Sequence, residues 1–351
     1  MENYHGKIEN LLDALDTFLD KERLSLNYPI SCNEMMKRAG IDGIKALLRS
    51  NDADLPNVPK CTGMDKIASH MQNSDLVFVA SPHHLGKPNL ALNFAVNTTI
   101  NHKMPVLFFT NSIGVDWLIG RLIAHMSMVD VARISPPSHL TDDNRSSIAA
   151  ALLAIADMPL YFDYDKNDLT ISEMAEKCRN IKQESGLGLV MIDYFQLIDS
   201  EDLLIDYLQS GKYHEAVDID ALYTDEGDFI NEEFSRIEET EKARALKSLA
   251  VELDCPVIAT VSTFVYKKDR TIRPKLADLR EIGDIEQFAD FIGFLYTDDE
   301  FNLFCSDDEG VVELIVAKHR NKVADIEKLH FQGKYARFEN ISHSKEEYSH
   351  V

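Results

Sequence analysis

The pattern of apolar and polar positions along the chain changes at about residue 64. Up to residue 55, apolar residues recur three and four positions apart, as on one face of a helix, at Ile8, Leu11, Leu12, Leu15, Phe18 and Leu19. A second short helix is predicted at Ile41–Leu48, and a stretch rich in proline and glycine follows at 56–63. We therefore expect a small helical N-terminal segment over 1–55 and a linker over 56–63.

After residue 64, short apolar runs alternate with amphipathic stretches, which is the pattern of a parallel sheet covered by helices on both faces. The runs predict strands at Leu76–Ala80, Pro105–Phe109, Leu187–Ile192, Pro256–Val261, Phe291–Leu295 and Val311–Ala317. Helices fit between most of them, for example at Asn89–His102, Ile171–Glu184 and Glu239–Leu253. One or two closing strands are expected within Lys328–Ile341. The prediction is an α/β domain over 64–345, and such sheets bind ligands at the carboxyl ends of their strands.

Acidic residues dominate the charge of this chain of 351 residues, and they are unevenly placed. The 36 Lys and Arg against 59 Asp and Glu give a net charge of −23. The segment 199–241 holds fifteen acidic residues against Lys212 and Arg236, a net of −13. We interpret it as an acidic insertion, either a solvated loop or a surface for a basic partner or a nucleic-acid mimic. The net charge argues against non-specific adhesion to nucleic acid or anionic membranes.

Cysteine usage and hydropathy indicate the cellular compartment in which the protein acts. The five cysteines are scattered and form no CxxC pair, which argues against a disulfide scaffold or a zinc site and favours a reducing environment. No apolar run approaches the ~18 residues of a membrane span. The first residues mix charges with apolar positions, unlike a signal peptide. We expect a cytoplasmic protein that makes no membrane contact.

A loop that ends in Gly-Lys follows the first predicted strand. The residues from Ser81 to Pro88 read SPHHLGKP and precede a predicted helix, which is the setting of a P-loop. In a P-loop, backbone N–H groups and the helix N-terminus hold phosphates, and the Lys reaches the β- and γ-phosphates. Pro88 occupies the position of the Ser or Thr that binds Mg²⁺, and it offers neither a hydroxyl nor an N–H. An ordinary β–α turn is the alternative for Gly86-Lys87 alone.

A second motif is the apolar strand that ends in Asp193, with the sequence LVMID. An aspartate in this place is the Walker B pattern, whose carboxylate helps to orient Mg²⁺. The alternative is an aspartate that caps the next element. Together, the Gly-Lys loop and this strand are more specific than either alone.

Two groups of cations complete the candidates. Lys318 and Arg320 alternate after the strand predicted to begin at Val311, as in an arginine finger, or they are simply solvated. The segment Arg273–Gln287, with further cations upstream, forms a basic cluster in an otherwise acidic chain. Such a loop can hold a phosphate backbone, or its charges can pair within the chain.

From about Thr62 to Ile341 the chain resembles the ATPase domain of bacterial replicative helicases of the DnaB type, which has a RecA-like fold. The matching blocks are Glu173–Leu197, Ala277–Asp290, Ala317–Asn321 and Tyr335–Asn340. The resemblance implies ATP and Mg²⁺ as ligands, and its motifs fall on three sets of residues. The resemblance implies that Gly86, Lys87 and Asp193 bind the nucleotide and that Asp193 also serves Mg²⁺. It implies that Lys318 and Arg320 are fingers toward a neighbouring subunit. It implies that Arg280, Glu281 and Gly283 contact single-stranded DNA.

Three positions depart from the family's pattern. Pro88 replaces the metal-binding hydroxyl, Ser112 stands where the family has a catalytic Glu, and Ser262 replaces a Gln that senses the γ-phosphate. A serine cannot act as the base that activates water at neutral pH. A single oriented catalytic group is worth ~10²–10⁴ in rate, and losses within one unit do not simply multiply. The combined loss argues against fast hydrolysis.

Three hypotheses follow. The first is a helicase-like protein of DNA replication with little or no ATPase activity, which binds or regulates a replicative helicase or another replisome protein. The second is an active ATP-dependent DNA helicase in which Asn89 replaces the metal ligand and Asp116 the base. The third is a structural or decoy protein that binds neither nucleotide nor DNA and uses its acidic surface on a basic partner. The resemblance also implies a ring, usually a hexamer, but residues 1–55 are too short for the family's N-terminal domain. Monomer and oligomer therefore both stay open.

Overall fold

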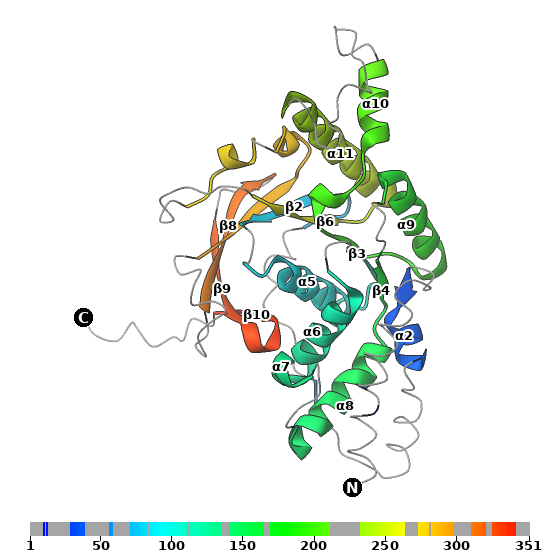
Figure 1. Cartoon of the computed structure of the whole chain (residues 1–351), viewed down its shortest axis with the longest axis vertical. Coiled ribbons are helices and arrows are strands. Elements are labelled where there is room, and N and C mark those ends of the chain that lie inside the picture. The colour runs from blue at the N-terminus through cyan, green and yellow to red at the C-terminus, as the bar shows by residue number, and fades with distance from the viewer. Residues whose placement is uncertain are drawn as a thin grey trace, which may run out of the picture.

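The computed structural model describes residues 10, 12, 29–38, 56–58, 71–82, 85–110, 113–134, 140–164, 169–210, 232–263, 273–280, 282–297, 310–320 and 325–341. Within these ranges the chain forms one ten-stranded sheet with helices on both faces (Figure 1). The strand order is β1-β4-β3-β5-β6-β2-β7-β8-β9-β10. The expectation of an α/β fold with helices on both faces of the sheet is confirmed.

The strands are β1 (Ile30–Ser31), β2 (Leu76–Ser81), β3 (Val106–Thr110), β4 (Leu160–Asp163), β5 (Leu189–Asp193), β6 (Val257–Ser262), β7 (Phe291–Tyr296), β8 (Gly310–His319), β9 (Ile326–Gln332) and β10 (Arg337–Asn340). The six from β4 to β7 in the sheet order are parallel. Antiparallel pairing adds β1 at one edge and β8, β9 and β10 at the other. Each of the six predicted strands is present, and the closing segment forms two strands. The sequence pattern did not predict β1 or β4.

The helices are α2 (Cys32–Arg38), α5 (Lys87–Asn101), α6 (Val115–Ser127), α7 (Val131–Ile134), α8 (Asp142–Ala156), α9 (Ile171–Ser185), α10 (Glu201–Gln209) and α11 (Glu232–Leu253). The starts of α8 and α9 carry capping boxes, built by Thr141 with Asn144 and by Thr170 with Glu173. These pairs satisfy N–H groups that a helix start leaves unpaired. None of the described helices is both long and apolar enough to cross a lipid bilayer.

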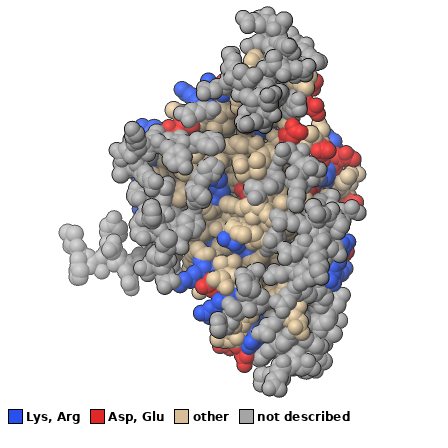
Figure 2. All heavy atoms as spheres, in the orientation of Figure 1, with Lys and Arg blue, Asp and Glu red and all other residues tan. Residues whose placement is uncertain are grey.

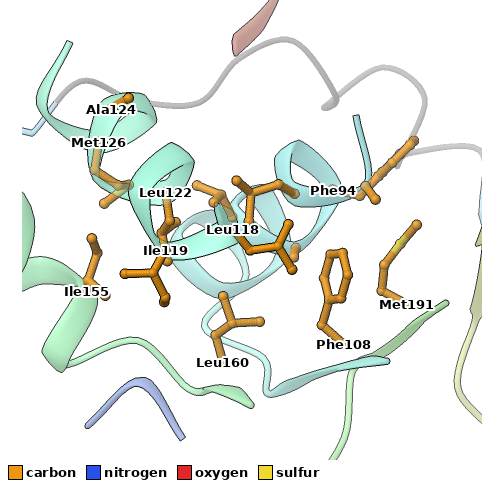
Figure 3. Packing of buried hydrophobic residues seen from close by; sticks show 14 of the residues in the cluster. Phe94, Phe108, Leu118, Ile119, Leu122, Ala124, Met126, Ile155, Leu160 and Met191 are labelled. Atoms are coloured by element: carbon orange, nitrogen blue, oxygen red, sulfur yellow. The ribbon is translucent and has the colours of Figure 1, made fainter. Parts of the chain in front are cut away.

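Alternate side chains of the sheet face two cores. Val77 and Val79 of β2 join the core beneath α5, α6 and α8, whereas Phe78 faces the core beneath α9 and α11. Figure 3 shows the first core, in which Phe94 of α5 and Leu118 of α6 pack over Phe108 of β3. Because each fully buried Leu or Phe contributes about 1.5–3 kcal/mol, these two layers stabilise the long sheet.

Part of the N-terminal segment belongs to the same packed body. Ile30 pairs with Phe162 at the β4 edge, and Asn33 Nδ2 donates a hydrogen bond to the carbonyl of Ala156 at 2.8 Å. Three side chains of α2 are fully buried, those of Cys32, Met35 and Met36. The helix predicted at 41–48, and all of the one at 8–19 except residues 10 and 12, lie outside the described residues. The domain boundary at 55 stays a prediction.

The acidic segment 199–241 has helical ends. It begins with α10 and ends in α11, which starts at Glu232, seven residues before the predicted start at Glu239. The two helices pack together at one end of the molecule (Figure 1). Acidic side chains lie beside them in Figure 2. Residues 211–231 lie outside the described ranges.

Candidate functional site

The carboxyl ends of four neighbouring strands bring the nucleotide-site candidates together. Asp193 ends β5 beside Thr110 of β3, and Ser262 ends β6 beside Ser81 of β2. The loop that follows Ser81 leads to Lys87 at the start of α5. The sheet therefore places Lys87, Asp193 and Ser262 at one edge, as the rule for parallel sheets predicts.

The Gly-Lys loop rests on the closing strands. Gly86 has a φ of 75°, a left-handed conformation that glycine adopts without steric cost. A Cβ at Gly86 would come within 3.5 Å of the ring of Phe331 and 3.7 Å of that of Phe338. These two rings stack with centroids 4.5 Å apart. The loop thus lies directly against an aromatic pair from β9 and β10.

Asn93 fastens the last strand to α5. Its Nδ2 donates to the carbonyl of Ala336 at 3.0 Å, and its Oδ1 accepts from the N–H of Phe338 at 3.0 Å. All these groups are buried, so each bond satisfies a polar atom that would otherwise be costly to bury. The closing strands therefore hold both the loop and the helix that starts from it.

Lys87 is folded back against its own strand. Its Nζ donates to the carbonyls of Ser81 at 3.0 Å and Pro82 at 2.9 Å. Burial lowers the pKa of the Lys87 ammonium to about 8, and the nearby charge of Asp193 opposes this shift. The ammonium is thus held by the dipoles of two carbonyl groups. A bound anion at this place would strongly stabilise its charged form.

Asp193 is buried and accepts a hydrogen bond from Thr260 Oγ1 at 2.6 Å. Pro88 lies in the first turn of α5, where proline is tolerated. The next residue, Asn89, is 5% exposed, and its Oδ1 has no hydrogen-bond partner within the described part of the chain. The side chain of Asn89 therefore holds an unpaired buried amide oxygen, while its Nδ2 would lie 3.7 Å from a Cβ at Gly86.

Gln196 fixes the end of β6, a role that the sequence did not predict. It follows Asp193 in a short 3₁₀ turn, Phe195–Leu197. Its Nε2 donates to the carbonyl of Ser262 at 2.8 Å, and its Oε1 accepts from the N–H of Ser262 at 3.2 Å. The signal in the sequence that could have indicated this role is a polar residue three positions after Asp193. Ser112 and the side chain of Asp116 lie outside what the structure describes.

The candidate finger residues lie at the opposite edge of the sheet. Because β8 runs antiparallel to β7, His319 pairs with Phe291 at the amino end of that strand. Arg320 follows and forms an ion pair with the buried Asp290. The length of β2, six residues at ~3.3 Å each, separates this edge from the Lys87 loop. Within one chain the structure does not bring Lys318 or Arg320 to Lys87.

The candidate DNA-contact residues are placed differently from one another. Arg280 is exposed and lies 3.8 Å from a carboxylate oxygen of Glu286. Gly283 is buried against α11, and a Cβ there would be 2.7 Å from the carbonyl of Arg236. Glu281 lies outside the described residues, as do the basic positions 267–270. The DNA-binding role of all three stays a prediction.

The site suits Mg²⁺ in the manner of phosphate-transferring enzymes. Among the described residues, no three His, Cys, Asp or Glu side chains are grouped as a metal centre. Mg²⁺ is usually held by one or two carboxylates together with phosphate oxygens, so Asp193 fits this role without a cluster. Pro88, however, removes the hydroxyl ligand.

The sheet, the Gly-Lys loop and the aspartate at the end of β5 define a P-loop domain of the RecA-like type. The model of the family described as "DnaB-like helicase C terminal domain" matches residues 59–340, and the chain belongs to this family. The resemblance read from the sequence is thereby confirmed.

Two curated relatives illustrate the relationship. "Replicative DNA helicase DnaB" of Leifsonia xyli is 35% identical over 309 residues, which cover 86% of this chain and 60% of the relative. The protein of the same name from Geobacillus stearothermophilus is 31% identical over 298 residues, 84% of this chain and 59% of the relative. The chain thus spans about three fifths of the length of these relatives.

Solved structures show the same fold. The ATPase domain of G40P superposes with a TM-score of 0.63 and 25% identity, over 86% of this chain and 97% of that one. A DnaB-like replicative helicase, solved in a study of its interactions with primase, gives a TM-score of 0.64 at 24% identity, over 86% and 66% of the two chains.

Proposed function

We propose that this helicase domain binds ATP without hydrolysing it at helicase rates, and that it binds or regulates a replicative helicase or another replisome protein. One observation carries the proposal. Pro88 occupies the first turn of α5 directly after Lys87, where a working P-loop presents a hydroxyl to Mg²⁺. Family membership supports a role in DNA replication.

Gly86, Lys87 and Asp193 are the proposed nucleotide-binding residues. The N-terminus of the fifteen-residue helix α5 favours an anion, because its free N–H groups and dipole point toward the loop. A pKa of about 8 keeps most Lys87 side chains protonated near neutral pH, so the ammonium can exchange its two carbonyls for phosphate oxygens. Bound Mg²⁺ would neutralise phosphate charge, and Asp193 is the residue proposed to orient it.

The same edge explains the proposed slow chemistry. Ser262 lies at the end of β6, next to Ser81, where the family has its γ-phosphate sensor. Its backbone is held by Gln196, so the position is ordered although its side chain is short. Ser112 stands in place of the catalytic base. We therefore propose that the nucleotide acts as a bound ligand rather than as a substrate for hydrolysis.

The amino edge supports a proposal of assembly. Lys318 and Arg320 lie too far from Lys87 to serve the nucleotide of their own chain, which is the placement a trans-acting finger requires. We propose that two or more copies, or this chain and a relative, join so that these cations face a neighbour's nucleotide.

The acidic helices support a weakened interaction with single-stranded DNA. Arg280, Glu281 and Gly283 are the proposed DNA contacts, and α11 packs its acid-rich first half directly against Gly283. Negative charge so close to a phosphate backbone would be only partly screened at physiological salt.

An active ATP-dependent DNA helicase is the second candidate, and Asn89 favours it. Its buried amide oxygen has no hydrogen-bond partner among the described residues, and the Nδ2 of the same amide would lie 3.7 Å from a Cβ at Gly86. Amide oxygens can ligate hard cations, so this atom is the candidate replacement for the missing hydroxyl.

The test is calorimetric ATP binding by the full chain with Mg²⁺, compared with Lys87→Ala and with Lys37→Ala, an exposed lysine on α2. We expect binding in the wild type and in Lys37→Ala, and its loss in Lys87→Ala. Absence of binding in the wild type would overturn the nucleotide proposal. ATP turnover that single-stranded DNA stimulates and Lys87→Ala abolishes would favour the active helicase.

The regulatory role is tested by mixing the chain with the full-length Geobacillus stearothermophilus relative. Co-elution and a change in the relative's ATPase rate are expected. Independent elution with an unchanged rate would count against this role.

A further inference from the structure

A segment of the chain between β6 and β7, described over residues 276–280 and 282–290, is fastened to the rest of the protein at two places. We call it the η segment, since it contains the 3₁₀ turns Leu276–Leu279 and Ile285–Gln287. It holds the candidate DNA contacts, and it leads directly into β7.

The first attachment is to α11. The N–H of Asp284 donates to Thr240 Oγ1 at 2.9 Å, and the Asp284 carboxylate lies 4.0 Å from the Arg236 guanidinium. Gly283 approaches α11 so closely that a Cβ would be 2.7 Å from a backbone oxygen and 3.0 Å from Thr240 Oγ1. Contact with backbone leaves no room for a side chain, so the fit requires glycine.

The second attachment is Asp290, a carboxylate that is 5% exposed. Its Oδ2 accepts from the N–H of Leu76 at 2.8 Å and from Lys247 Nζ at 2.6 Å, and its Oδ1 forms the ion pair with Arg320. The N–H of Arg320 also donates to the Asp290 carbonyl at 3.0 Å. Side chain and backbone of Asp290 together therefore fix the direction of Arg320.

Glu286 links the two groups of cations in a similar way. Its carbonyl accepts a hydrogen bond from Lys318 Nζ, and its carboxylate lies 3.8 Å from the Arg280 guanidinium. One residue of the η segment thus contacts both a candidate DNA contact and a candidate finger.

The contacts to Arg320 leave part of its guanidinium available. The side chain is 56% exposed, and a guanidinium carries five N–H donors, more than Asp290 can accept. The buried carboxylate therefore orients the guanidinium and leaves some of its N–H groups available to another acceptor.

We propose that Asp290 and Glu286 are positioning residues, which make Arg320 and Lys318 move together with the η segment. The contacts themselves do not depend on nucleotide or DNA. Their functional consequence rests on the proposed assembly. When the η segment shifts in one subunit, both cations change their orientation toward the phosphates that the neighbouring subunit holds.

The test displaces the η segment and reads the effect at Arg320. Gly283→Ala forces the segment away from α11, and the rate of phenylglyoxal labelling of each arginine is mapped by peptide mass spectrometry. We expect Arg320 to react roughly tenfold faster, the equivalent of losing one hydrogen bond to a charged group. Arg179 is the internal control, because its side chain is 47% exposed and it is also paired with a carboxylate, Glu252.

The matched control variant is Gly186→Ala. Gly186 also has a positive φ of 79°, but a Cβ there would meet nothing within 4 Å. Labelling of Arg320 in this variant should equal that of the wild type. Faster labelling of Arg320 in both variants would attribute the effect to general backbone strain and overturn the proposal.

A global loss of structure would show as faster labelling of Arg179 as well. In that event Thr240→Val replaces Gly283→Ala, since it removes the hydroxyl that accepts from Asp284 and keeps the side-chain volume. Unchanged Arg320 labelling, with increased hydrogen exchange over 282–290, would overturn the proposal. Because neither measurement uses ATP, a failure here leaves the proposed nucleotide binding intact, and the reverse also holds.

Discussion

The two edges of the sheet hold their cations in opposite ways. At the carboxyl edge, Lys87 is buried and bonded to two carbonyls, and burial lowers the pKa of its ammonium to about 8. At the amino edge, Arg320 is exposed and paired with the buried carboxylate of Asp290. The first cation is poorly neutralised, whereas the second already has a counter-charge.

This difference indicates what each edge is suited to do. An anion that reaches Lys87 restores the interactions that burial removed, so the carboxyl edge favours phosphate binding. At the amino edge a phosphate must share Arg320 with Asp290, so binding there depends on how the carboxylate is placed. Because β2 separates the two, a complete nucleotide site of the proposed kind needs a second chain.

The largest effect is expected at the amino edge. Asp290→Ala leaves Lys247 and the N–H of Leu76 without their shared acceptor, and breaking a buried pair costs about 3–5 kcal/mol. Urea unfolding should show this loss, with Asp157→Ala, an exposed aspartate, as the control. A loss below about 1 kcal/mol would mean that Asp290 is not the anchor of this edge.

At the carboxyl edge, stability should depend on pH through Lys87. The pKa of its ammonium is 10.5 ordinarily and about 8 in the folded protein, so between these values the unfolded chain binds more protons. The wild type should therefore gain stability relative to Lys87→Met as pH rises from about 8 toward 10.5. The full difference corresponds to about 3 kcal/mol. Parallel stability curves for the two proteins would contradict the lowered pKa.

A smaller effect is expected beneath the Gly-Lys loop. Asn93→Leu leaves the buried N–H of Phe338 unpaired and the carbonyl of Ala336 with His125 Nδ1, 3.5 Å away, as its remaining partner, at a cost of about 1–3 kcal/mol. Hydrogen exchange should increase over β10 while β7 and β8 stay protected. Uniform loss of protection at both edges would show that the closing strands do not support the loop separately.

The smallest effect on stability is expected for Pro88→Thr. Proline restricts the unfolded chain, so its removal should lower stability by about 0.4–1 kcal/mol. The new hydroxyl and N–H should at the same time make ATP affinity depend on Mg²⁺ more steeply than in the wild type. Equal Mg²⁺ dependence, measured calorimetrically, would show that Pro88 does not limit the metal site.

The sequence predicts the carboxyl edge better than the amino edge, for a physical reason. Apolar runs locate strands, and parallel strands end together, so the meeting of Lys87, Asp193 and Ser262 follows from pattern alone. The pairing of Arg320 with Asp290 depends on the antiparallel register of β7 and β8, which shifts between Ile292 and Gly293. No local pattern encodes that register.

Short or unusual elements escape the pattern for related reasons. β4 has four residues and β1 only two, too few to show a period of two. The first turns of α11 are acidic, which masks their helical pattern until Glu239. Burial of Met35 and Met36 depends on the distant helix α8, so it is visible only in the folded chain.

The central claim, a helicase domain that binds ATP but hydrolyses it slowly, is tested most directly by one measurement. The rate of ATP hydrolysis with Mg²⁺ and an oligo-dT strand is compared with that of the Geobacillus stearothermophilus relative, for the wild type and for Pro88→Thr/Ser112→Glu/Ser262→Gln. The account predicts a wild-type rate lower by a factor of ~10²–10⁴ or more, and a partial recovery in the triple variant. A wild-type rate that matches the relative, rises with DNA and disappears in Lys87→Ala would contradict it.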